Sequence, residues 1–584
     1  MKKRFWKFVS FAALSSLFLL TAFSVVAVAG GATPKRAPMS AAYAKYLARK
    51  KAGTWHLNLA KGGHGMGRLP NRFDRSYLLK AARTERAAAR AAAIRSGEAY
   101  KFTSPALSFM QRKGIVSATL TTPPSSFDLR SLGKIGPVED QGNCGSCWDF
   151  AALASLESTL PKTVAFSENN MLDSDGFDWG PNDGGLDSLS IAYLTRCGVP
   201  KSETQYPYHY QWPSPYAPLA DTSLASPAVR VNDVYTIPSD PADIRGIIWG
   251  TKSAVTISFY YDDSLYYQNA GFTYPATATV ANFFNPYSST NQYLTQLPNG
   301  GGHEVSVIGW DDNYLASNFR NSAGAVPPGP GAYLCRNQWG AYWGAPCGTA
   351  KYDNQGGYFW ISYYDKSVEY YGQYSDLYKP SPAGQYTQVY QYDPLGATNY
   401  WGWSAPDGYM ANVFKADNAG KHIKAVGFYV NDYSASYEIK IYDNVNTYID
   451  ANNNIVAGNS APDPTAGTLV WDQYGGTLYS DPAGDVPAGY HTIKLNRPVP
   501  VTPGDNFSVV VYLYDNYGYP YPWAVEDIEP RYSDRAYSTT GQSYDSSDGV
   551  TWKDFYYDDS YTDPTTSVTT YYNGNACIKA YAAP

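Results

Sequence analysis

One stretch of eight residues constrains this chain more than any other, because it joins an expected helix start to a candidate nucleophile. Residues 141–148 read Gln-Gly-Asn-Cys-Gly-Ser-Cys-Trp. A helix beginning at Cys147 would direct its backbone N–H groups and the positive end of its dipole at the sulfur, and both favour the thiolate. Attack on a carbonyl also needs a donor for the oxyanion that forms, and the amide of Gln141 can supply one. The stretch therefore predicts a nucleophilic cysteine that needs a base from elsewhere in the chain.

Charge is distributed unevenly along the 584 residues, a length that predicts roughly two to four domains. Residues 30–122 hold 18 Lys and Arg against three Asp and Glu, whereas residues 123–584 hold 23 against 48. Opposite charges on two parts of one chain predict that the basic part binds the acidic part. The alternative is a disordered basic arm that adheres to acidic surfaces. The acidic balance of the larger part argues against nucleic acid as its partner, because phosphates would be repelled.

The N-terminus has the pattern of a secretory signal. Basic residues among the first seven precede an apolar run over 8–26, and a small-x-small cleavage site ends at Ala29. We expect residues 1–29 to be removed, which leaves a secreted or cell-surface protein without a membrane span. The alternative is an uncleaved anchor, because the apolar run is long for a signal.

Local signals divide the rest of the chain. Residues 78–94 are rich in Ala and Arg and lack Gly and Pro, which predicts a helix within the basic part. The two prolines at 123–124 interrupt helix and strand alike and mark the end of that part. The part that follows mixes both signals, with a helix expected over 147–160 and strands over 305–310 and 358–363.

A second change of character follows residues 379–384, which have the Pro-, Gly- and Ser-containing composition of a linker. Beyond them, short alternating segments with turn signals between them replace the helical patterns. Examples are residues 426–430, 437–442, 468–471, 491–495 and 507–513. This pattern predicts an all-β sandwich. No loop in it has the ligand spacing of a metal site, so no metal is expected there.

A nucleophilic cysteine needs a base, and the base needs a group that orients it. Of the six His in the chain, His209 and His303 fall in the same part as Cys147. His303 follows three glycines and precedes an apolar strand, whereas His209 lies in a loop rich in Pro and aromatic residues, so His303 is the better candidate. An Asn amide can fix an imidazole, and a Trp can shield that hydrogen bond from water. Asn337 and Trp339 supply these two side chains.

These motifs together resemble the papain-like cysteine proteases over roughly 250 residues. Residues 137–142 are similar to the family's entry to its active-site helix, and 206–208 to a family loop. Residues 337–340, Asn-Gln-Trp-Gly, are similar to its Asn-Ser-Trp-Gly, and 182–185 to the Gly-Gly strand that pairs with substrate backbone. The start at 127–130 and the appended β-rich part resemble the microbial subgroup that carries a C-terminal lectin-like domain.

The resemblance implies a fold and its boundaries. The fold class would be α+β, with a papain-like peptidase domain over 123–378 that has a helical lobe and a β-barrel-like lobe. A lectin-like β-sandwich would follow over 379–584. A helical, basic prosegment would precede them over 30–122, after a signal peptide over 1–29.

The resemblance also implies a role for each residue of the catalytic motifs. Cys147 would be the nucleophile and His303 the general base and acid. Asn337 would orient the imidazole, and Gln141 would donate to the oxyanion.

The substrate would meet a second set of residues. Gly184 and Gly185 would pair with its backbone, and Trp339 would lie beside the catalytic pair. Glu304, directly after the base, would line the second substrate pocket and favour basic side chains there.

Several positions depart from the family's pattern. Asn182 stands where the family has a disulfide cysteine, so Cys144 has lost its usual partner and either pairs with Cys197 or stays free. Cys335 and Cys347 are close in sequence and are the easiest pair to join.

Asp149 replaces a small residue two places after the nucleophile. It would be a buried, paired group, or it would raise the pKa of the thiol.

We therefore expect a secreted cysteine endopeptidase that acts on protein or peptide substrates through a Cys147 acyl-enzyme and needs no cofactor. It would be made as a precursor that its own prosegment inhibits, less strongly at high salt. The β-rich part would bind carbohydrate or a cell-surface ligand through aromatic side chains, or serve as a rigid spacer. The competing hypothesis is a non-catalytic surface or adhesion protein that keeps a protease fold, and Asp149 is the feature that favours it.

Overall fold

The computed structural model defines most of the chain after the expected signal peptide. It describes residues 34–97, 103–161, 164–196, 201–209, 229–268, 280–288, 292–293, 296–319, 325–347, 356–381, 385–445, 463–480, 484–558, 560–562, 569–571 and 574–584. The expected signal peptide and Cys197 lie outside these ranges.

The helices include both of those expected from the sequence. Those described are α1 (Ala41–Lys51), α2 (Ser76–Ser96), α3 (Pro105–Arg112), α4 (Cys147–Ser158), α5 (Glu168–Ser174), α6 (Asp187–Thr195), α7 (Pro241–Thr251) and α9 (Phe555–Asp558). Every residue of α4 is buried, so this helix forms the centre of its region rather than a surface layer. Among the described residues, no helix combines the length and apolarity that crossing a membrane requires.

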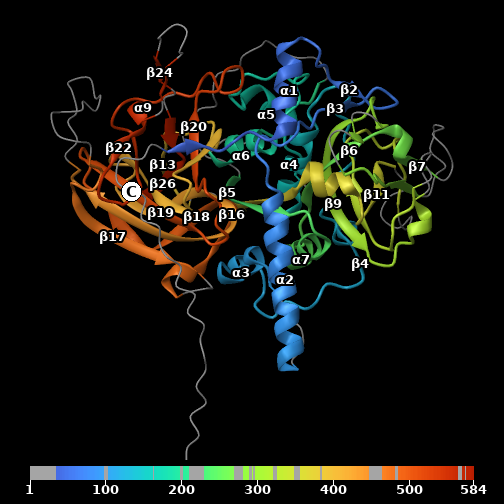
Figure 1. Cartoon of the computed structure of the whole chain (residues 1–584), viewed down its shortest axis with the longest axis horizontal. Helices are drawn as coiled ribbons and strands as arrows, with labels where there is room; N and C mark the ends of the chain where they lie inside the picture. The colour runs from blue at the N-terminus through green and yellow to red at the C-terminus, as the bar shows by residue number, and fades with distance from the viewer. Residues whose placement is uncertain are drawn as a thin grey trace, which may run out of the picture.

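A seven-stranded sheet lies on one side of α4, and Figure 1 draws most of it in green and yellow. Its order is β4 (Ser126–Asp128), β9 (Gly301–Asp311), β10 (Ala332–Arg336), β11 (Tyr358–Ser362), β8 (Ala281–Phe283) and β7 (Tyr266–Gln268), and β6 (Val255–Tyr261) also pairs with β9. β9 and β11 are the two strands expected here. The described strands do not pair end to end, so the expected barrel-like lobe is an open sheet, not a closed barrel.

A second, larger sheet lies mostly in the C-terminal region, where Figure 1 draws its strands in orange and red. Its order is β12 (Tyr374–Ser381), β5 (Arg230–Pro238), β18 (Val486–Pro500), β16 (His422–Asp443), β19 (Asn506–Asp515), β15 (Asp407–Lys415), β21 (Ser543–Ser546) and β22 (Lys553–Asp554). β13 (Gln388–Tyr390), β17 (Thr468–Gly475) and β26 (Ile578–Ala583) pair beside this path. The strands expected from the alternating segments all occur in it.

A four-stranded sheet packs against this larger sheet and completes a sandwich. Its order is β1 (Lys35–Arg36), β14 (Asn399–Gly402), β20 (Trp523–Asp527) and β25 (Gly574–Ala576). Trp401 and Trp523 from the small sheet share one buried cluster with Phe428 and Ile439 from the large one. The expected sandwich is thereby confirmed. Two short hairpins, β2 (Asn58–Leu59) with β3 (Gly65–Met66) and β23 (Ser560–Thr562) with β24 (Thr569–Tyr571), lie outside these sheets.

The two β-rich regions are continuous with each other through β5. This strand pairs with β12 on one side and with β18 on the other, so the large sheet crosses from one region to the other. Gly489 makes the close approach possible, because a Cβ there would lie 1.9 Å from the Val234 carbonyl oxygen. Residues 379–381 belong to β12, so the segment expected to be a linker begins inside a strand. The composition of this segment gives no sign that its first residues pair with β5.

The N-terminal segment, residues 34–97, crosses both regions. β1 adds a strand to the edge of β14 in the small sheet, and α1 lies over the helical region (Figure 1). The second half of α2 extends away from the body of the molecule, and most of its side chains there are exposed. The segment therefore contacts both regions through its first part and the start of α2.

Candidate active site

Cys147 is the first residue of α4, with its sulfur at the positive end of the helix. The side chain is a fully buried, free thiol. Backbone N–H groups of Gly67 and Glu304 hydrogen-bond to its sulfur. Because Gly67 belongs to the N-terminal segment, that segment covers the thiol.

His303 and Asn337 are brought together by neighbouring strands. His303 lies near the start of β9, and Asn337 directly follows β10, which pairs with β9 in an antiparallel fashion. The Nε2 of His303 lies 2.8 Å from the Oδ1 of Asn337. The Trp339 ring packs against the imidazole at 4.4 Å between centroids, which shields this hydrogen bond from water. The Nδ1 of His303 is buried and makes no hydrogen bond with a described residue, so one ring nitrogen is oriented while the other stays available.

Gln141 is fixed at the same end of α4. Its Oε1 accepts a hydrogen bond from the Trp339 indole at 3.1 Å. Its Nε2 donates to the carbonyl oxygens of Cys144, at 2.8 Å, and of Gly65, at 3.2 Å. The amide expected to hold an oxyanion therefore holds a carbonyl of the N-terminal segment.

Burial sets the protonation of the pair in this state. It raises the pKa of the Cys147 thiol to about 12, and the charge of Glu304 adds to that effect. Burial also lowers the pKa of His303 to about 3, although the hydrogen bond with Asn337 opposes the shift. At neutral pH both groups are therefore neutral, and the thiol is a poor nucleophile in the covered state.

Gly184 and Gly185 also lie against the N-terminal segment. The Gly185 N–H donates to the Gly67 carbonyl at 2.8 Å, and the Leu69 N–H donates to the Gly185 carbonyl at 3.0 Å. A Cβ at Gly185 would lie 2.1 Å from the Trp148 indole nitrogen, so no larger residue fits without moving that ring. The expected substrate-pairing strand thus pairs with the N-terminal segment.

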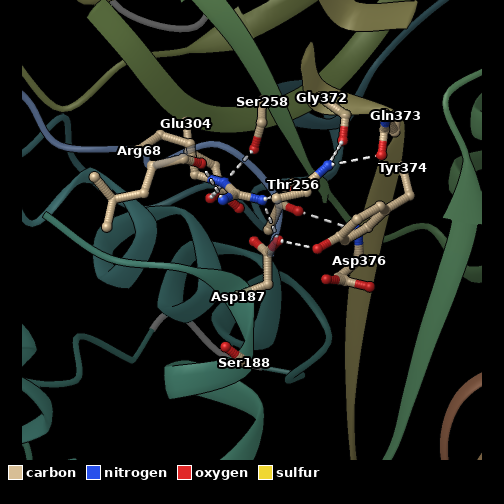
Figure 2. A network of polar contacts seen from close by, with 12 residues as sticks. Arg68, Asp187, Ser188, Thr256, Ser258, Glu304, Gly372, Gln373, Tyr374 and Asp376 are labelled. Carbon is tan, nitrogen blue, oxygen red and sulfur yellow. Dashed lines mark hydrogen bonds and ion pairs between the residues drawn. The ribbon is translucent and has the colours of Figure 1, made fainter. Parts of the chain in front are cut away.

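Glu304 lies in a buried polar network that receives Arg68 from the same segment (Figure 2). Arg68 Nε donates to Ser258 Oγ and lies 3.0 Å from a Glu304 carboxylate oxygen. Arg68 Nη2 donates to the Asp187 carboxylate at 2.5 Å. The Tyr374 hydroxyl donates to the same Asp187 oxygen at 2.8 Å.

Sequence reasoning named Glu304 here but missed Asp187, Ser258 and Tyr374. Asp187 stands two places after Gly185 and begins α6, a position that could have drawn attention to it. Nothing in the sequence pointed to Ser258 or Tyr374, because their strands meet the others in the folded chain.

The alternative base, His209, does not join this constellation. Its Nε2 lies 3.1 Å from Asn169 Nδ2, and Asn169 Oδ1 accepts a hydrogen bond from its backbone N–H. Among the described residues, no group of His, Cys, Asp and Glu could hold a metal ion.

Asp149 is buried but differs from both expectations. Neither of its carboxylate oxygens has a hydrogen-bond partner among the described residues, so it is not a paired group. Burial raises its pKa well above the usual value, and the nearby Asp175 and Glu139 add to the shift, which favours the neutral carboxyl. Its charge is not among the causes that raise the pKa of the Cys147 thiol.

Cys335 and Cys347, the pair easiest to join by their closeness in sequence, form no disulfide, because both are buried free thiols. Cys335 lies within β10, whereas the Cys347 sulfur is directed at the carbonyl oxygens of Ala281 and Tyr358. Cys144 forms no disulfide with a described residue, and Cys197, its partner in one of the two alternatives left open, lies outside the described residues.

Comparison with known proteins agrees with these two regions. The family model "Papain family cysteine protease" matches residues 123–357, and the model "Lectin like domain" matches residues 389–468 and 483–582. The structure is similar to that of the cysteine protease and lectin-like domains of Cwp84, a surface layer associated protein of Clostridium difficile. The TM-score is 0.61 at 18% identity, over 94% of this chain and 98% of that one. A second Cwp84 structure, after propeptide cleavage, gives a TM-score of 0.58 at 21% identity, over 79% and 100% of the two chains.

Curated relatives match part of this chain. A cathepsin L-like proteinase of Fasciola hepatica is 25% identical over 228 residues, 38% of this chain and 58% of its own length. A viral cathepsin of Spodoptera litura multicapsid nucleopolyhedrovirus is 43% identical over 89 residues, 15% and 26% of the two chains. The chain thus spans between about a quarter and three fifths of these relatives. With the sheets and helices described above, these matches show that the chain carries a papain-family cysteine protease domain followed by a lectin-like domain.

Proposed function

We propose that this chain is the precursor of a secreted cysteine endopeptidase, inhibited by its own N-terminal segment. The observation that carries the proposal is the set of contacts at the start of α4. There His303 is oriented by Asn337 at 2.8 Å, and the Gln141 amide and the Cys147 thiol both bind backbone of the segment 65–67. A segment held at a nucleophile and at an oxyanion donor occupies the place of a substrate.

The reaction is acyl transfer to sulfur and then to water. With the segment gone, Cys147 transfers its proton to His303, and the thiolate attacks the peptide carbonyl carbon. The Gln141 amide and the Cys147 N–H hold the oxyanion. His303 then protonates the leaving amine as the C–N bond breaks. It next takes a proton from water, which attacks the thioester and releases the acid and the thiol.

The N-terminal segment acts as the inhibitor in this proposal. It covers the thiol with Gly67, occupies the Gln141 amide with Gly65 and pairs with Gly185. The Cwp84 structure described after propeptide cleavage supports removal of a comparable segment. The boundaries that we propose are a signal peptide over 1–29, a prosegment over 30–122, a peptidase domain over 123–378 and a lectin-like domain over 379–584.

A cell-surface location follows from the signal pattern at the N-terminus. The surface layer association of Cwp84 supports it. The lectin-like domain would hold the enzyme at carbohydrate or another surface ligand. Exposed aromatic rings such as Tyr474 and Tyr537 are the side chains that stack on sugar faces.

Hydrolysis of casein under reducing conditions by the full chain, after its N-terminal segment has been released, tests the proposed activity. The matched variant is Cys147→Ala, which keeps the fold but lacks the nucleophile. We expect it to lose hydrolysis and covalent labelling by a thiol-directed epoxide. Equal hydrolysis by the variant would refute the mechanism, and absence of hydrolysis by the parent would favour the non-catalytic adhesion protein.

A further inference from the structure

Lys579 and Asp393 form an ion pair in the interior of the lectin-like domain. The Lys579 Nζ lies 2.6 Å from Asp393 Oδ2 and also donates to the Asp393 backbone carbonyl at 3.2 Å. Both side chains are fully buried, with exposed fractions of 0%. Lys113 binds Asp233 at a similar distance of 2.7 Å, but the lysine side chain there is 26% exposed. The Lys579 pair therefore lacks the contact with solvent that stabilises the charge of Lys113.

Two paired strands hold the amine and the carboxyl group together. β13 pairs with β26 in an antiparallel fashion, with Tyr390 opposite Ala580 (Figure 1). Asp393 lies shortly after β13, and Lys579 lies within β26, whose residues are all buried. The fold thus keeps the two reactive groups in contact, which gives them a high effective concentration toward each other.

Burial makes the charged form of this pair unfavourable. An ammonium and a carboxylate each lose their hydration in the interior, and the attraction between them often does not repay that loss. Burial raises the pKa of Asp393, although the charge of Lys579 opposes the shift. An amide formed from the same two groups carries no charge. The interior that disfavours the ion pair therefore favours its condensation product.

Glu526 supplies a second carboxyl group at this site. Its Oε1 accepts a hydrogen bond from the Leu395 N–H at 2.7 Å, and its Oε2 accepts one from the Asn575 amide at 3.3 Å. Burial raises the pKa of Glu526 to about 8, and the charge of Asp393 adds to the effect. This shift favours the protonated acid at neutral pH, so Glu526 can donate a proton here.

We propose that Lys579 and Asp393 condense in the folded chain to an intramolecular amide bond, with Glu526 as the proton carrier. The ammonium first passes one proton to the carboxylate along the 2.6 Å contact. The amine nitrogen then attacks Asp393 Cγ, so that the Nζ–Cγ bond forms and the Cγ–Oδ2 bond breaks. Glu526 gives a proton to the departing oxygen and takes one from the nitrogen. One water molecule leaves, and the step needs no oxidant.

The bond closes the lectin-like domain into a covalent loop. It joins the segment after β13 to β26, the strands near the two ends of the region that matches the lectin-like family. Its two residues are 186 positions apart. A cross-link over a long loop restricts the unfolded chain, so the domain resists unfolding. The inference concerns this domain alone and does not rest on the proposed peptidase activity.

Peptide mass spectrometry of the full chain, in the Cys147→Ala background, tests the bond directly. Trypsin cleaves after an unmodified Lys579 but not after one that carries an amide. We expect a branched peptide that contains Lys579 and Asp393 and is lighter than its two linear components by one water molecule. The peptide with Lys113, whose ion pair is open to solvent, is the matched control and should stay linear. If the main product is a linear peptide that ends at Lys579, the contact is an ion pair only and the proposal is overturned.

Two variants in the same background test the assignment of the residues. Lys579→Arg keeps the positive charge but has no amine that forms this amide. It should lack the branched peptide and should have a Tm at least about 5 °C below that of the parent. A branched peptide at Asp393 that persists in this variant overturns the assignment to Lys579.

Glu526→Gln keeps the size of the side chain and both partners of the ion pair but removes the acid. We expect its branched fraction, at a fixed time after synthesis, to fall at least about tenfold below that of the parent. Circular dichroism should show that the variant is folded, which separates a slower reaction from a lost fold. A branched fraction equal to that of the parent overturns the role of Glu526 as the proton carrier.

Discussion

The side-chain amide of Gln141 donates a hydrogen bond to the carbonyl oxygen of Gly65, 76 residues earlier in the chain. An amide that stabilises an oxyanion is thereby occupied by a ground-state carbonyl of the same protein. The segment thus binds the reactive groups themselves rather than a neighbouring surface.

Removing this donor tests its role in the reaction. In the processed enzyme, Gln141→Ala should lower kcat by about 10²–10³-fold with little change in KM, because an oxyanion donor acts mainly in the transition state. Gln141→Glu keeps the size of the side chain and removes the donor, so it should behave in the same way. Steady-state kinetics of the two variants would contradict the role if Gln141→Glu kept the activity of the parent.

Reactivity of the thiol should report whether the segment covers it. Because burial raises the pKa of Cys147 to about 12, almost all of the thiol keeps its proton at pH 7 in the full chain. Since a raised thiol pKa keeps the proton on sulfur, alkylation by iodoacetamide should be slow and should rise about tenfold for each pH unit above 7. After release of the segment, we expect at least about a hundredfold faster alkylation at pH 7. Mass spectrometry should assign the gain to Cys147 while the buried Cys335 stays unmodified, and equal rates before and after release would contradict the inhibitory role.

Ion pairs between the N-terminal segment and the lectin-like domain should stabilise the precursor. Arg72 lies 3.2 Å from a Glu529 oxygen, and Arg36 binds Asp527 at 3.0 Å. A double-mutant cycle of Arg72→Ala and Glu529→Ala should give a coupling of about 1–3 kcal/mol in urea unfolding. The Arg72 and Glu529 side chains are 6% and 13% exposed, so this coupling should fall less with salt than that of an exposed pair. Lys440 with Glu438, more exposed at 28% and 16%, is the matched comparison, and a coupling near zero for Arg72 would contradict this prediction.

The sequence predicts where helices and strands lie better than it predicts which strands pair. The alternating pattern predicts two separate strands, 426–430 and 437–442, with a turn between them. In the structure both belong to β16, and the residues between them form a shift in register with β18. A bulge can absorb such residues without ending a strand, and the pairing that decides this is not local.

In the candidate site, too, residues marked by local sequence could be predicted, whereas contacts between distant residues could not. Gln141, Cys147, His303 and Asn337 could be predicted from the sequence, because glycine turns and a helix start mark such positions locally. The contact of Arg68 with Asp187 joins residues 119 apart, and no local pattern marks either one. The composition of residues 379–384 predicts a linker, but residues 379–381 belong to β12, because they pair with β5, a strand more than a hundred residues earlier.

The junction of the two domains depends on a glycine. Gly489 has φ +127° and pairs with Tyr235 across β18 and β5, where a Cβ would lie 1.9 Å from the Val234 carbonyl oxygen. Gly504→Ala is the matched control, because its φ of +93° carries a similar backbone strain but nothing lies within 4 Å of the added Cβ. In the Cys147→Ala background, Gly489→Ala should lower the free energy of unfolding by about 2–4 kcal/mol more than the control.

The form of the unfolding curve adds a second readout for this variant. If β5 and β18 couple the domains, their separation in Gly489→Ala should split one transition into two, followed by circular dichroism and by tryptophan fluorescence. The Gly504→Ala variant should keep the transition of the parent, since its strain lies away from the junction. Equal losses of stability in both variants would show that backbone strain, and not the close approach of the two strands, sets the requirement for glycine.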